Sequence, residues 1–220
     1  MSKDVNRLLL DGQNNWDIFG DLRRLPKEFY SRHALQVGPE LLGLLLIHEN
    51  PNRPDRILAG IITEVEAYVG PHDRACHGYG MSKTNRNKAM YGRPGTAYVF
   101  FIYGMHYCFN IAVFKEGLPY AILVRSVEPI LGKDIMLKRR NGKYPLASGP
   151  GRLCQAMGIT KNHDGADLVT GSLYLAKPSK PCVSTAGLKI VKTPRIGIDY
   201  SGPARDYPWR FMLHPKELTR

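Results

Sequence analysis

The sequence lacks any apolar run long enough to cross a bilayer. A membrane-spanning helix needs about 18 consecutive apolar residues, and the longest apolar stretches, 41–47 and 98–113, are broken by Gly, Tyr, His or Asn. The start of the chain also lacks the apolar core and cleavage site of a secretory signal peptide. We therefore expect no membrane partner and an intracellular location: cytoplasm and nucleoid in a bacterium, the nucleus in a eukaryote.

Cysteine pairs are absent as well. The chain has 4 cysteines and no Cys-x-x-Cys motif. Their wide spacing favours neither a structural zinc site nor a framework of disulfides. We expect reduced and mostly buried thiols at Cys76, Cys108, Cys154 and Cys182.

Acidic residues are missing from long parts of the chain. The formal net charge is +12, and no Asp or Glu occurs from Arg74 to Lys115 or from Ile135 to His163. A surplus of Lys and Arg favours phosphate backbones, acidic proteins or anionic lipid as partners. The basic segments are rich in Gly, Pro and Asn, which disfavours a helix lying on a membrane. Charge alone leaves open a solvated basic surface without a partner.

The residues that are present indicate a mixed α/β fold of the α+β class. At 220 residues, 43% of them apolar, the chain can bury one sizeable core. We expect a single domain over residues 1–220, with 1–24 as a candidate peripheral segment. Its predicted architecture is a mainly antiparallel curved sheet with flanking helices and a protruding β-hairpin.

Hydrophobic periodicity and Gly/Pro breaks locate the elements. A helical stretch from Lys27 leads into a short apolar strand at 41–48, and two further helices are expected at 133–141 and 151–159. The SGPG sequence before the last helix is a plausible helix start whose free N–H groups could hold a phosphate. Strands are expected at 57–70, 96–114 with a central turn, 118–129, 172–177, 187–192, 194–200 and 208–213.

Two irregular features stand out between the predicted strands. A glycine-rich basic loop at 71–95 is long enough to suggest a functional role. The strand pattern at 96–114 pivots near Tyr103-Gly104, because Gly permits a tight turn. This places Tyr103 near a hairpin tip, where there is no core for its ring to enter.

One predicted strand carries two carboxylates. Side chains alternate along a strand, so Glu64, Glu66 and Tyr68 lie on one face. A carboxylate facing the core must be paired or have a raised pKa, and one of the two could act as a general base. Arg125, inside another apolar run, is a natural partner. The alternative is that both carboxylates face water and have no role.

Other chemistries find weaker support. The spacing of the acidic and histidine side chains between Glu64 and His77 fits no strong zinc template. Side chains of adjacent residues rarely point the same way, which disfavours Cys76 and His77 as a nucleophile and its base. The glycine-rich segments lack the Lys-Ser/Thr ending of a phosphate-binding loop. We therefore expect no metal and no cofactor, although a metal-dependent hydrolase stays open as an alternative.

Aromatic residues are concentrated in the first acid-free segment. Bases can stack on such rings, so positive charge combined with aromatic faces suggests nucleic acid, whether the protein is an enzyme or a binding module without catalysis. Singly, each ring is more often core packing than a stacking platform. The rings are those of Tyr79, Tyr91, Tyr98, Phe100, Phe101, Tyr103, Tyr107 and Phe109.

Several motifs occur together in one order. They are TEVEAYVGPHDRACH, TNRNKAMYGRPGTAYVFFIYGMHYCFNI, LVRSVEP, SGPGRLCQAMGI and PRIGI. In these motifs the sequence resembles the alkyladenine (3-methyladenine) DNA glycosylases of the mixed α/β, non-helix-hairpin-helix type, over about residues 25–213. The resemblance implies a DNA repair enzyme that flips alkylated or otherwise damaged purines out of duplex DNA. It would hydrolyse the N-glycosidic bond with an activated water and leave an abasic site. We expect the protein to be a monomer.

The resemblance also implies roles for individual residues. Glu66 corresponds to the carboxylate that deprotonates the attacking water, and Arg125 to the arginine that helps hold that water. A backbone carbonyl of the PRIGI segment, at Ile196, would lie near the same water. Tyr68 and His77 correspond to the residues that sandwich the extruded base, and the backbone N–H of His77 would contact the base edge. No catalytic role transfers to Glu64.

Further positions follow from the same match. Asn110 corresponds to the asparagine that crowds the exocyclic amine of guanine. Phe100 departs from the family pattern, which has a tyrosine there, so stacking is expected to survive while any hydrogen bond of that hydroxyl is lost. Tyr103, with Met105, corresponds to the wedge inserted into the duplex. We assign contacts with the DNA backbone to Arg86, Lys88, Arg93 and Arg152.

Overall fold

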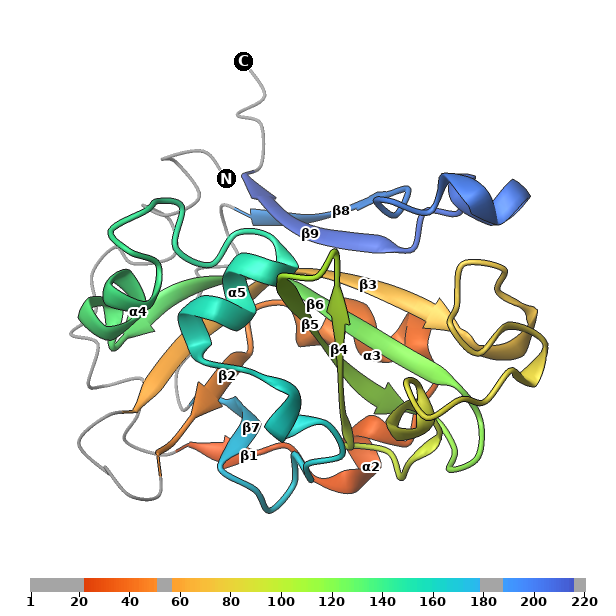
Figure 1. The fold of residues 1–220 in the computed structure, drawn as a ribbon, viewed down its shortest axis with the longest axis horizontal. Coiled ribbons are helices and arrows are strands. Elements are labelled where there is room, and N and C mark those ends of the chain that lie inside the picture. Colours follow the sequence, from red (N-terminus) through yellow and green to blue (C-terminus); the bar gives the residue numbers. More distant parts are fainter. Residues whose placement is uncertain (1–21, 51–56, 179–187, 216–220) are drawn as a thin grey trace.

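The computed structural model describes residues 22–50, 57–178 and 188–215. These residues form a curved, mainly antiparallel sheet with helices packed against it (Figure 1). The path of paired strands runs β1, β7, β2, β3, β6, β5, β4, and β9 joins β3 and β8 beside it. The strands are β1 (Arg23–Arg24), β2 (Leu45–His48), β3 (Leu58–Val69), β4 (Ala97–Ile102), β5 (His106–Val113), β6 (Tyr120–Leu131), β7 (Leu173–Lys177), β8 (Leu188–Thr193) and β9 (Arg210–Pro215).

The long strands β3 and β6 form the centre of the sheet. β3 pairs with β6 along one edge, while its other edge pairs first with β2 and then, at Glu64–Glu66, with β9. The β3–β6 register shifts on both sides of Glu64, which leaves Thr63 on β3 and Arg125 on β6 without a Cα partner across the pair. Such irregularities bend strands and re-aim side chains. This one lies where the predicted site residues cluster.

Helices cover both faces of the central strands. α3 (Ala34–Leu41) packs against β3 and β6, and α5 (Pro150–Met157) packs against β5 and β6 from the other face (Figure 1). α3 buries Ala34, Val37 and Leu41 at helical spacing. Gly38 lets the ring of Phe211 approach closely, since a Cβ at Gly38 would lie 3.3 Å from that ring. The other two α-helices of the described residues are α2 (Lys27–Tyr30) and α4 (Lys133–Arg139).

The predicted fold class is confirmed. The expected helices, the 41–48 strand, the two-strand hairpin at 96–114 and most other strands are present. The strand expected at 194–200 is wrong: residues 194–198 form no strand, and a 3-10 segment, Asp199–Asp206, follows. Gly197 has φ 76° there, and Arg195 turns its side chain inward to a buried carboxylate, so the backbone cannot stay extended.

Two predictions drawn from what the sequence lacks, paired cysteines and membrane-spanning runs, can be compared with the structure of the described residues. Cys76, Cys108 and Cys154 are free and buried, whereas Cys182 lies outside the described residues. Among the described helices, none is long and apolar enough to cross a membrane. Most of the candidate peripheral segment at 1–24 also lies outside the described residues.

Candidate active site

Glu66 is the most enclosed charged group near the pocket. Its side chain has no exposed surface, yet three donors from three segments reach it. Tyr68 Oη donates to Oε2 at 2.9 Å, and the backbone N–H of Ile196 donates to Oε1 at 2.8 Å. Arg125 Nη1 lies 3.2 Å from Oε1. The carboxylate is thus buried among polar donors rather than in the apolar core.

Alternation along β3 puts the two carboxylates and Tyr68 on one face, as predicted. Arg125, at the β6 irregularity, contacts both carboxylates: its Nε donates to Glu64 Oε1 at 2.8 Å, and its Nη1 faces Glu66. Burial acts to lower the pKa of Arg125, but the charges of Glu66 and Glu64 outweigh it and leave that pKa raised. Arg210 of β9 donates to the same Glu64 oxygen at 2.6 Å. The alternative in which both carboxylates face water is wrong.

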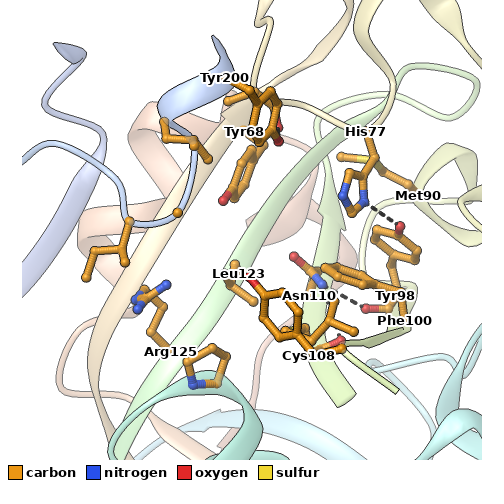
Figure 2. Close-up of a pocket in the computed structure, with 17 residues that line it drawn as sticks. Tyr68, His77, Met90, Tyr98, Phe100, Cys108, Asn110, Leu123, Arg125 and Tyr200 are labelled. Atoms are coloured by element: carbon orange, nitrogen blue, oxygen red, sulfur yellow. Dashed lines mark hydrogen bonds between the residues drawn. The ribbon is translucent and has the colours of Figure 1, made fainter. Parts of the chain in front are cut away.

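A pocket of about 320 Å³ lies beside this cluster. Figure 2 shows Tyr68 and His77 projecting toward the same space from different segments, with Asn110, Phe100 and Arg125 below them. Its size falls within the range of about 300–1,000 Å³ that is common for small-molecule sites. The structure thus brings together the residues that the motifs assigned to the base-binding pocket, including the backbone segment at Ile196.

His77 is fixed by two contacts that the sequence did not predict. Its Nδ1 lies 2.8 Å from the hydroxyl of Tyr98, and Asn87 Nδ2 donates to its backbone carbonyl at 2.8 Å. Burial, with a smaller effect of Arg86, lowers the pKa of His77 and favours the neutral ring. Burial also raises the pKa of Tyr98, which keeps its hydroxyl protonated. If that hydroxyl donates to Nδ1, Nε2 of His77 carries the proton and is left as a donor.

Phe100 and Asn110 close the same side of the pocket. The rings of His77 and Phe100 are 4.6 Å apart in an edge-to-face arrangement, which is favourable for aromatic pairs. Asn110 is buried, and its Nδ2 donates to the carbonyl of Tyr98 at 3.2 Å. That bond orients the amide and leaves its oxygen for other contacts.

A buried ion pair lies behind Tyr68. Arg195 Nη1 and Asp73 Oδ2 are 2.5 Å apart, and both side chains are fully buried. The guanidinium also lies 4.7 Å from the ring centre of Tyr68 and 5.0 Å from that of Trp209. Burial, reinforced by the charge of Glu66, raises the pKa of Tyr68, so the phenol stays a donor. Both charged residues occur in the quoted motifs, but their long sequence separation hid the pairing.

The hairpin of β4 and β5 ends in an exposed apolar tip. Tyr103 is 84% exposed and Met105 is 68% exposed, and Tyr103 also lines the pocket. Tyr103 has φ 51° and Gly104 has φ 66°, a left-handed turn that Gly tolerates and Tyr rarely adopts. The predicted position of Tyr103 at a hairpin tip is therefore confirmed.

The four basic residues assigned to the DNA backbone are all exposed, but they are not gathered in one place. Arg86 donates to the carbonyl of Phe101 at 2.9 Å and lies over the Phe100 ring. Arg152 is on α5, whose first residue lines the pocket. Both therefore lie near the pocket mouth.

The other two lie elsewhere. Lys88 lines a separate hollow formed with Asp164 and neighbouring loop residues. Arg93 precedes β4, at the end opposite the Tyr103 turn, and lies 3.8 Å from Glu116. The structure thus gives these two no place at the pocket mouth, and their contacts with DNA stay a prediction.

Metal and nucleophile chemistry gain no support from the geometry. Asp73 is committed to Arg195, and no group of three or more His, Cys, Asp or Glu side chains within the described ranges is placed to hold a metal ion. The thiol of Cys76 lies 3.2 Å from the carbonyl of Pro119, and burial raises its pKa to about 12. A thiol in that state is a poor nucleophile near neutral pH.

The family model for methylpurine-DNA glycosylase (MPG) matches residues 28–217. The chain belongs to this family. Its relatives include proteins named as candidate 3-methyladenine DNA glycosylases. The relative from Desulfitobacterium hafniense is 43% identical over 208 residues, covering 90% of this chain and 98% of its own. The relative from Methanocella arvoryzae is 44% identical over 191 residues, covering 85% and 90% respectively.

A third relative, from Clostridium novyi, is 42% identical over 202 residues, with 87% of this chain and 96% of its own covered. The resemblance stated from the motifs is therefore confirmed. As a methylpurine-DNA glycosylase family member, the chain is a DNA glycosylase, and DNA is its substrate. The pocket and the carboxylate cluster lie within the matched region.

Proposed function

We propose that this protein flips a methylated purine out of duplex DNA and hydrolyses its N-glycosidic bond, with Glu66 as the general base. The observation that carries the proposal is Glu66 itself: an enclosed carboxylate with three polar donors, all from residues that line an aromatic pocket. A glycosylase must take the base out of the stack before it can reach the bond. The pocket supplies the place for that base.

The aromatic walls suit a purine. A flipped base between Tyr68 and His77 would stack on one ring and meet Phe100 beside the other, as Figure 2 allows. Methylated purines that carry positive charge gain cation–π attraction from such faces. Asn110 would exclude bases with a bulky exocyclic group next to it. Tyr103, exposed at the hairpin tip, would fill the gap left in the duplex and offset part of the cost of unstacking, a few kcal/mol.

Glu66 would act in two ways on the reacting sugar. Breaking the bond builds positive charge on the sugar, which an anionic carboxylate stabilises, and the same carboxylate accepts a proton from the attacking water. Arg125 Nη1 would help hold that water. At Ile196 the observed contact differs from the expected one: the N–H group, rather than the carbonyl, bonds to Glu66. In this scheme the backbone of Ile196 orients the carboxylate of Glu66, the general base, rather than the water.

Access to Glu66 requires a rearrangement. The carboxylate has no exposed surface, because Tyr68, Arg125 and Ile196 separate it from the pocket space. We propose that insertion of a base moves the Tyr68 ring enough to free Oε2 for a water. No lysine is among the described residues lining the pocket, so water rather than an amine is the proposed nucleophile and an abasic site the product.

The test is Glu66→Gln, which keeps the shape and removes the charge. We expect the single-turnover rate of base release from a duplex with one methylated purine to fall by about 10²-fold or more, in line with loss of a general base. Affinity for the same duplex should stay within a few fold. Alkaline cleavage of the DNA after incubation reports abasic sites, and a DNA-binding module without catalysis would give none with either protein.

A matched control is Glu40→Gln. Glu40, on α3, forms an exposed ion pair with Arg32 at 2.8 Å, and neither residue lines the pocket. The rate of the Glu40 variant should equal that of the wild type. Release of methylated base by the Glu66 variant at the wild-type rate would show that another group is the base.

A further inference from the structure

Glu64 and Arg210 have no part in the proposed reaction, yet Glu64 is bonded to Arg125, which does, and Arg210 is bonded to Glu64. Glu64 Oε1 accepts from Arg125 Nε at 2.8 Å and from Arg210 Nε at 2.6 Å. Arg125 in turn reaches Glu66 through Nη1. The four side chains thus form a row of alternating charge that ends at Glu66.

The row is shielded from solvent. Side-chain exposure is 20% for Arg210, 16% for Glu64, 11% for Arg125 and 0% for Glu66. Charges at such depth are screened much less than surface charges, so removing one changes the electrostatic potential at the others. The exposed members are at one end of the row and the proposed base is at the other.

The backbone pairing makes this bonding pattern informative. Arg210 is the Cα partner of Glu66 across the β3–β9 pair, but its guanidinium bonds to Glu64 instead. Glu64 therefore draws Arg210 away from the proposed base. It also holds Arg125 by Nε, the one guanidinium nitrogen that leaves both terminal nitrogens free.

We propose that Glu64 is a positioning residue for the glycosylase reaction, holding Arg125 in place beside Glu66 and, together with Arg210, balancing the charge that Glu66 experiences. The inference rests on the proposed role of Glu66. It deepens that role, because it names the residues that set how readily the base is ionised.

Other charged or titratable groups near Glu66 are accounted for. Tyr68 faces Glu66 from the same strand, Cys108 faces it from β5, and Arg195 faces it from the loop before the last 3-10 segment. Arg195 is neutralised by its bidentate pair with Asp73. Loss of Glu64 would therefore leave two arginines, Arg125 and Arg210, facing Glu66 with no second carboxylate to balance them.

The test uses the fall in rate on the acid side of the pH–rate profile, measured in single turnover on a duplex with one methylated purine. Glu64→Gln keeps an acceptor oxygen and removes a negative charge, so this fall should move to lower pH by on the order of one unit. Arg210→Gln removes a positive charge and should move it to higher pH. The double variant should return close to the wild-type profile. A merely structural role would not give shifts of opposite sign that cancel.

A second variant separates position from charge. Glu64→Ala removes the acceptor for Arg125 Nε as well as the charge, so its plateau rate should be lower than that of Glu64→Gln, by about tenfold or more if one charge-assisted hydrogen bond is lost. Glu40→Gln, which alters an exposed pair, should match the wild type in both plateau and profile. Thermal unfolding of each variant identifies any that fail to fold.

The outcomes are decisive for this inference alone. An unchanged acid limb in Glu64→Gln, or shifts of the same sign in both single variants, would overturn it while leaving Glu66 as the base. If Glu64→Gln does not fold, Arg210→Gln decides: a shift to higher pH supports the inference, and no shift overturns it. Wild-type activity of Glu66→Gln would instead overturn the proposed function.

Discussion

Arg195 and Asp73 form a bidentate ion pair with no exposed side-chain surface, directly behind the ring of Tyr68. The same guanidinium donates to the carbonyls of Ala67 and Ala204. Ile196, the next residue in the chain, donates its N–H to Glu66. One buried pair therefore ties the long loop, strand β3 and the 194–198 segment together, and it sets where both Tyr68 and the Ile196 backbone lie.

The first prediction concerns that pair. Asp73→Ala leaves Arg195 buried without its counter-charge, and we expect the free energy of unfolding to fall by about 3–5 kcal/mol. Chemical denaturation measures this loss. The matched control is Asp206→Ala, which removes an exposed partner of Arg205 and should change stability little. Equal effects of the two substitutions would contradict a structural role for the buried pair.

The second prediction concerns the hairpin tip. Tyr103→Ala should leave stability unchanged, because the side chain is mostly exposed. The rate of base release should fall by about tenfold or more, since the vacated stack would refill with the flipped base. Tyr144→Ala alters another exposed tyrosine, 73% exposed and bordering a different cavity, and should keep the wild-type rate. Full activity of the Tyr103 variant would show that Tyr103 does not act as the wedge in the duplex.

The third prediction concerns the basic surface. Affinity for duplex DNA should fall steeply with added salt, because each phosphate contact releases a counterion. Arg152→Gln should reduce the slope of log K against log salt by about 0.9, the value for one contact. Arg32→Gln is the comparison, since Arg32 pairs with Glu40 at 2.8 Å and is not assigned to the DNA backbone, so the slope should stay as in the wild type. A flat salt profile in the wild type would argue against phosphate contacts.

The fourth prediction concerns two facing histidines. His48 Nδ1 lies 2.7 Å from the carbonyl of Met157, and the Nε2 atoms of His48 and His163 are 3.1 Å apart. Burial lowers the pKa of both. The folded state thus binds fewer protons than the unfolded state, whose histidines have a pKa of about 6.5. Their contribution to stability is complete above that value and is lost as pH falls below it.

Denaturation at about pH 7.5 and about pH 5.5 checks this sign. The wild type should lose stability on acidification. His48→Gln should lose less between the same two pH values, because one of the titrating groups is gone. An equal or larger loss in the variant would show that the histidine pair does not carry the effect.

Most of the fold was predictable because local patterns agree with the final packing. Alternation along β3 gave the shared face of Glu64, Glu66 and Tyr68, and the Gly104 turn gave the exposed tip. The segment at 194–200 failed because its apolar residues resemble a strand, whereas Gly197 and the buried partner of Arg195 decide its path. That partner is more than a hundred residues away, and spacing carries no trace of it.

The residues of the candidate site were predictable, but the contacts between their side chains were less so. Motifs named the proposed base, its arginine and the pocket rings, and the structure brings these together. They could not show that Tyr98 fixes His77 or that Arg210 joins Glu64. Those contacts depend on which strands are neighbours, and β9 reaches β3 only from the far end of the chain.

The register shift beside Glu64 has a consequence for the evolution of this chain. Insertion or deletion of one residue at the shift, ahead of Val65, would turn every later side chain of β3 to the other side. Val65 and Ala67 would then face the pocket, and Glu66 would point toward the side of β3 that α3 covers. A substitution on this strand changes one side chain at a time, whereas a change in the length of the strand would remove Glu66 and Tyr68 from the site together.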